Sequence, residues 1–166
     1  MVRKLISFLA IGALLFQFGC GGDALASELN LIISTTSAVV DIVEPQYAAQ
    51  LNPYFTSLTT FVDEVTTELA TTDTAIQRAT KIAADAAAIA KPDLTGLPAT
   101  IAARVEAIAP LVADLVTSVQ SLKSAIDSTP GGANAFFAAH KVKPPSAKTL
   151  AKIKAANAAL KAKLKH

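Results

Sequence analysis

The chain has 166 residues, of which 52% are hydrophobic and 5% aromatic, and its formal net charge is +2. Its single cysteine excludes a disulfide within the chain, and one cysteine with two histidines provides too few ligands for a structural zinc site. The histidines also form no Glu-x-x-His pair for a di-iron bundle and no Cys-x-x-Cys-His sequence for haem attachment. No metal or other cofactor is therefore predicted.

The N-terminal segment has the pattern of an export signal. Arg3 and Lys4 precede an almost unbroken apolar run over residues 5–18, and glycines follow this run. Such a run is typical of a secretory signal peptide and is short for a membrane span. We therefore expect an exported protein.

The end of the apolar run resembles the lipobox of bacterial lipoprotein precursors. Gly19 and Cys20 match the pattern of that family and two glycines follow, whereas Gln17 and Phe18 depart from it. The resemblance implies a signal peptide of residues 1–19. It also implies that Cys20 carries acyl chains such as palmitate, which anchor the protein in a membrane of the bacterial cell envelope. The body of the protein would then lie in the periplasm or at the cell surface.

Two alternatives to lipidation remain open. Ala24-Leu25-Ala26 is a small-x-small cleavage site, which would give a signal peptide of residues 1–26 and a secreted protein that begins at Ser27. The third interpretation is an N-terminal segment that is not cleaved and serves as an anchor itself.

Charge is distributed unevenly along the chain. Residues 21–127 contain all 13 acidic side chains and five basic ones, whereas residues 128–166 contain eight lysines and no acid. The first region has a net charge of −8 and the second a net charge of +8. With the turn residues, this pattern predicts an acidic helical body at 27–127, a Pro/Gly linker at 128–145 and a basic Lys/Ala-rich helix at 146–166.

Four segments of the body repeat apolar residues at steps of three and four, which is the spacing of a helix. The first covers residues 29–43, and its β-branched residues leave a strand open as the alternative. Asn52 and Pro53 predict the start of the second helix, as N-cap and first helical residue. Thr74 and Gln77 predict a capping box at the start of the third.

The fourth segment, residues 98–127, has the clearest pattern. We expect one continuous helix, kinked by Pro110 on its outer face, with an inward seam at heptad spacing. Together the four segments predict an all-α fold, an antiparallel four-helix bundle with a basic amphipathic C-terminal helix. The residues of the seam are Ile101, Val105, Ile108, Val112, Leu115, Val119, Leu122 and Ile126.

The basic segment has a narrow apolar stripe, with Asn157 at a core position of the stripe. Three interpretations are open. The segment folds back on the acidic body, it binds anionic lipid or polymer, or it self-associates with Asn157 fixing the register. In the first, its lysines would lie near acidic residues of the body, namely Asp63, Glu64, Glu68 or Asp114. The absence of arginine and interleaved aromatic residues argues against sequence-specific nucleic-acid binding. The predicted anionic-surface residues are Lys148, Lys152, Lys154, Lys161, Lys163 and Lys165.

No catalytic constellation is apparent in the sequence. A serine nucleophile would have only His140 as its base, and Glu64 with Glu68 is most simply a solvated helix face. We therefore predict a non-catalytic, exported, lipid-anchored structural or interaction module. The alternative is a carrier that binds a small apolar ligand inside the bundle, in a cavity walled by Phe55, Phe61 and the seam of residues 98–127.

Overall fold

The computed structural model describes residues 21–71, 75–140 and 145–165. In these ranges every regular element is a helix, which confirms the prediction of an all-α protein and excludes a strand for residues 29–43. The helices are α2 (Gly21–Val40), α3 (Pro45–Ala70), α4 (Ala75–Ala87), α5 (Ala99–Glu106), α6 (Ile108–Asp127), α7 (Gly132–His140) and α8 (Ala147–Lys163).

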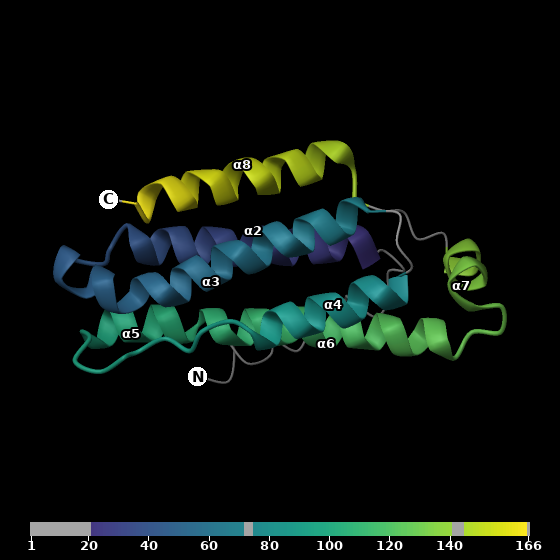
Figure 1. The fold of residues 1–166 in the computed structure, drawn as a ribbon, viewed down its shortest axis with the longest axis horizontal. Coiled ribbons are helices and arrows are strands. Elements are labelled where there is room, and N and C mark those ends of the chain that lie inside the picture. Colours follow the sequence, from purple (N-terminus) through teal and green to yellow (C-terminus); the bar gives the residue numbers. More distant parts are fainter. Residues whose placement is uncertain (1–20, 72–74, 141–144, 166) are drawn as a thin grey trace, which may run out of the picture.

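The helices pack side by side into an elongated body (Figure 1). Helix α2 contacts α3, α5, α6 and α8, and α4 packs against α3 and α6. Helix α8, shown in yellow-green, lies over α2 and α3, on the side opposite α5 and α6. Helix α7, which forms within the predicted linker, contacts α6. None of the helices in the described ranges combines the length and the apolar character that crossing a membrane requires.

The core is built from aliphatic side chains with a few aromatic rings. Each fully buried side chain of this kind contributes about 1.5–3 kcal/mol of transfer free energy, so the apolar faces of the helices dominate the packing. Helices α2, α3, α4, α5, α6 and α8 all contribute. The largest fully buried side chains include Leu29, Ile32, Leu51, Phe55, Leu58, Phe61, Ile82, Ile108, Leu115, Ile126 and Ile153.

Helix α3 begins eight residues earlier than its sequence predicts. Pro45 occupies the first turn after an extended Glu44, and Pro53 lies inside the helix rather than at its start. A proline in a helix leaves the carbonyl four residues earlier without a donor. Here Pro53 and Ala49 are both exposed, so water can solvate that carbonyl. The prediction that Asn52 caps this helix is therefore wrong.

The predicted rod over residues 98–127 is also interrupted. Helix α5 ends at Glu106 and α6 begins at Ile108, with Ala107 between them. Pro110 explains the position of the break, because it has no N–H for the Glu106 carbonyl and its ring displaces that carbonyl. The prediction of one continuous helix is wrong. The seam nevertheless stays inward on both sides of the break, with Val112 and Leu122 half-buried and the other six members buried.

Two predicted features fall on residues outside the described ranges. The first is the lipidation of Cys20. The second is the capping box of Thr74 and Gln77, because Thr74 is outside the described ranges, whereas Gln77 lies within α4.

Candidate functional site

Helix α8 carries the lysines that the sequence singles out, and it forms for local reasons. Alanine and lysine both favour helix, and Ser146 caps the first turn by accepting a hydrogen bond from the backbone N–H of Thr149 at 3.1 Å. The sequence of α8 contains no acidic residue, so the helix presents a single sign of charge.

The apolar stripe of α8 is its contact with the body. Ile153 and Leu160 are buried, and Leu150 and Leu164 are half-buried against the core. Helix α8 therefore folds back on α2 and α3, as the first interpretation of the basic segment expects.

Asn157 is the polar centre of this interface. The side chain is 1% exposed, and its Nδ2 donates to the backbone carbonyl of Thr59 at 2.9 Å and to Oδ1 of Asp63 at 2.5 Å. Asn157 thus fixes the register of a helix contact, but the contact is made within the chain. Its Oδ1 is buried and has no hydrogen-bond partner among the described residues.

Two of the six predicted lysines are held by the body. Lys161 pairs with Oδ2 of Asp63 on α3, and Lys163 donates to Oδ1 of Asp41 at 2.7 Å and to Oγ of Ser37 at 3.0 Å. All four charged side chains are between 40% and 57% exposed. Each of these ion pairs therefore contributes only about 0–1 kcal/mol, and salt weakens it.

The other four lysines lie at the surface. Lys148, Lys152, Lys154 and Lys165 are all exposed and form no ion pair or hydrogen bond with the described part of the chain. They are distributed over the part of the α8 surface that faces away from the body, because the apolar stripe occupies the side that faces it. Six lysines predicted as one set thus divide into two that seat the helix and four that are available to an external anion.

The acidic side chains of the body have different roles from one another. Glu68 pairs with Lys81 on α4 at 3.0 Å, and hydrogen bonds from Lys81 to Glu68 and then to Asp85 raise the pKa of the ammonium group. Burial, and secondly the nearby Asp114, raise the pKa of Glu28 on α2. Glu68, predicted as one partner of the basic segment, is therefore engaged with α4 instead.

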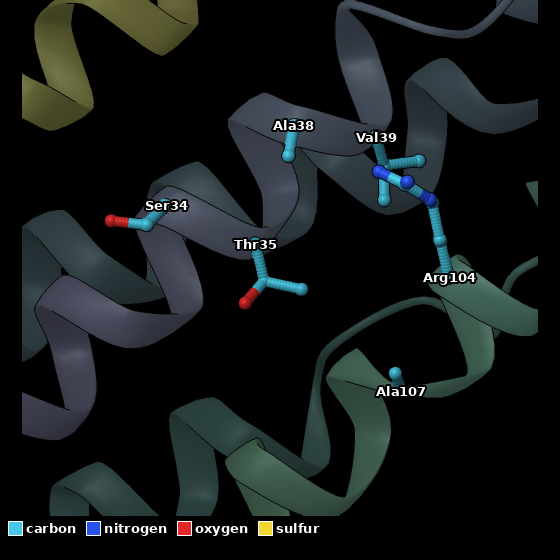
Figure 2. A pocket seen from close by; sticks show the side chains of 6 residues that line it. All are labelled: Ser34, Thr35, Ala38, Val39, Arg104 and Ala107. Atoms are coloured by element: carbon cyan, nitrogen blue, oxygen red, sulfur yellow. The ribbon is translucent and has the colours of Figure 1, made fainter.

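A second surface feature is an open groove between α2 and the α5–α6 break. It has a volume of about 320 Å³ and is lined by Ser34, Thr35, Ala38, Val39, Arg104 and Ala107. Figure 2 shows Thr35 and Arg104 directed into the space between the helices. Phe55 and Phe61, the predicted walls of a ligand cavity, do not line this groove and are each 1% exposed in the core.

Sequence reasoning did not find two residues of these sites. Asp41 follows the last residue of α2, and nothing in the local sequence indicates its contact with Lys163, 122 positions away. Arg104 is one of five basic residues in the acidic body, and its sequence context does not distinguish it from the others. The packing of α5 on α2 places it at the groove. Such long-range neighbours have no local sequence signal.

Comparisons with protein-family models, with curated proteins and with solved structures found no match to this chain. Among the residues that the structure describes, no three histidine, cysteine or acidic side chains gather as a metal site would require.

Proposed function

We propose that this protein is a non-catalytic module of the bacterial cell envelope, exported and anchored through lipid on Cys20, whose helix α8 binds anionic surfaces. The observation that supports this most directly is the set of four exposed lysines on α8 without an acidic partner in the described chain: Lys148, Lys152, Lys154 and Lys165. Each lysine near an anionic lipid surface contributes about 1 kcal/mol of attraction.

The way α8 is seated supports the same function. Its apolar stripe and Asn157 face the body, so the helix need not detach to present its free lysines. A rigid helix also loses less conformational entropy on binding than a disordered basic tail would. The attraction is electrostatic and has no base-reading element, so we propose an anionic lipid headgroup or polymer and no particular nucleic-acid sequence.

The architecture that we propose for this module is an antiparallel four-helix bundle of α2, α3, α4 and the α5–α6 pair, with α8 as an additional helix. Residues 41–44 form a short connection between α2 and α3, and the colour gradient in Figure 1 reverses direction from α2 to α3. Short connections are typical of antiparallel neighbours.

Vesicle binding tests the role of α8. We expect protein without lipid, beginning at residue 21, to bind phosphatidylglycerol vesicles and not phosphatidylcholine vesicles. The double variant Lys152→Gln/Lys154→Gln should weaken binding roughly 30-fold at low ionic strength, because two attractions of about 1 kcal/mol are lost.

A matched variant separates a site on α8 from an effect of net charge. Lys91→Gln/Lys123→Gln also removes two positive charges, but from the loop after α4 and from α6. This control should bind nearly as well as the unmodified protein. Equal losses in both variants would reject α8 as the binding surface.

Intact mass of the processed protein tests the anchor independently. Lipidation predicts a chain that begins at Cys20 with the added mass of acyl chains, and Cys20→Ser should release the protein from the membrane fraction. An unmodified chain beginning at Ser27 would reject the anchor and leave a secreted protein.

A further inference from the structure

We propose that the groove between α2 and the α5–α6 break binds a single-chain amphiphile with a carboxylate head, such as a free fatty acid. This site is separate from α8 and does not depend on surface binding by its lysines. It also differs from the predicted carrier cavity, because its walls are not the aromatic residues of the core.

The polar end of the groove has groups that are suited to a carboxylate. Arg104 is exposed and forms no ion pair or hydrogen bond with the described residues, and Thr35 makes no hydrogen bond within them either. Figure 2 shows the Arg104 side chain reaching from α5 towards Val39 on α2, so its guanidinium lies at the rim of the groove as a donor for a carboxylate.

The rest of the groove is apolar and extends along α2. Ala38, Val39 and Ala107 provide small aliphatic walls, which allow a slender chain to lie close to both helices. Leu31 and Ile42 are the exposed large hydrophobic residues of the described chain, at 49% and 42%.

Leu31 and Ala38 are seven positions apart on α2, which places them on one face of the helix with a separation of about 10 Å. Ile42 follows the end of this helix at Val40. An alkyl chain along this line would cover apolar surface that is otherwise in contact with water.

The volume and the charge favour a small amphiphile over a protein segment. About 320 Å³ lies at the lower end of the range for small-molecule sites. The apolar walls alone would accept any apolar molecule of this size. The guanidinium of Arg104 at the rim favours a ligand with an anionic head group.

Calorimetric titration of the processed protein tests the proposal, with dodecanoate below its micelle concentration as the probe and dodecan-1-ol as the uncharged reference. We expect one dodecanoate per chain. Arg104→Gln should weaken dodecanoate binding about fivefold, the effect of losing one exposed charge pair, and leave dodecan-1-ol binding unchanged. Lys91→Gln, which removes an exposed charge elsewhere, should change neither.

Filling the groove provides the second arm. Ala38→Trp introduces a large side chain at an exposed position of α2 and should abolish binding of both probes, and Ala107→Phe should do the same from the opposite wall. Circular dichroism checks that both variants remain helical.

Four results would overturn the proposal. The first is no binding by the unmodified protein, and the second is full binding by both filled variants. The third is loss of dodecanoate binding in Lys152→Gln/Lys154→Gln, which would place the amphiphile on α8. A dimer that dissociates on Ala38→Trp without any ligand would assign the groove to a second copy of the chain instead.

Discussion

Lys161 of α8 and Asp63 of α3 form an ion pair across 98 positions of the chain. The other oxygen of the same carboxylate accepts a hydrogen bond from Asn157, one helical turn earlier on α8. A single aspartate of α3 therefore holds one charged and one neutral donor. Two contacts at successive turns fix both the rotation of α8 and its position along α3.

The first prediction concerns the buried amide in this arrangement. Asn157→Ala should lower the free energy of unfolding by about 1–3 kcal/mol, because two hydrogen bonds are lost and a small cavity is left. Urea unfolding measures the change. Asn134→Ala, at an exposed position of α7, should change stability by less than about 0.5 kcal/mol. Equal effects at the two positions would contradict the role of Asn157.

The second prediction concerns the ion pair itself. A double-mutant cycle of Lys161→Met and Asp63→Asn should give a coupling free energy of about 0.2–1 kcal/mol at low salt, because both side chains are nearly half exposed. The coupling should shrink in roughly 1 M salt, where the Debye length is about 3 Å. A coupling that does not change with salt would show that the contact is not mainly electrostatic.

The third prediction follows from the raised pKa of Glu28. Burial and Asp114 both disfavour the ionised carboxylate in the folded state. Since the folded pKa lies above the ordinary value of 4.5, the folded state holds the proton more tightly, and stability falls as pH rises through this window. Glu28→Gln should therefore stabilise the protein at pH 7 and much less at pH 4, in urea unfolding at both values. A similar gain at both values would exclude the carboxylate charge as the cause.

The fourth prediction concerns Tyr54, whose side chain is 3% exposed. Its hydroxyl is buried without a hydrogen-bond partner among the described residues, and burial raises its pKa to about 12. The unfolded state ionises first, near pH 10, so stability should fall as pH rises from 10 towards 12. Tyr54→Phe should remove this alkaline loss and add about 1 kcal/mol at pH 7. Unfolding at pH 7 and pH 11 tests both effects, and a large destabilisation at pH 7 would contradict the missing partner.

Local pattern was enough to predict most of the helical segments, but not α7, which forms within the predicted linker, and not where the helices begin and end. The seam from Ile101 to Ile126 is turned inward because its spacing matches the helix period. Pro53 and Pro110 were harder to interpret, since proline can start, kink or interrupt a helix depending on its neighbours. At Pro53 the helix continues through an exposed turn, whereas at Pro110 it breaks three residues earlier.

The sequence predicted which residues belong to the candidate sites better than it predicted which residues they contact. The lysines of α8 and the special position of Asn157 are evident from periodicity alone. Asp63 was among the acidic residues expected near the basic segment, and it pairs with Lys161. Asp41 was not expected as a partner, because its contact with Lys163 depends on how α8 packs across α2 and α3. The groove at Arg104 has the same origin, because it exists only where α5 meets α2.

Helix α8 runs in the same direction as α2, and this direction matters if the protein is anchored at its N-terminus. Lys163, near the end of α8, contacts Ser37 and Asp41 near the end of α2, so α8 begins on the side where α2 begins at Gly21 (Figure 1). Lipid on residue 20 would therefore hold the first turns of α8 close to the headgroups. Such proximity raises the effective concentration of Lys148 and its neighbours at the bilayer, so that weak individual attractions act together.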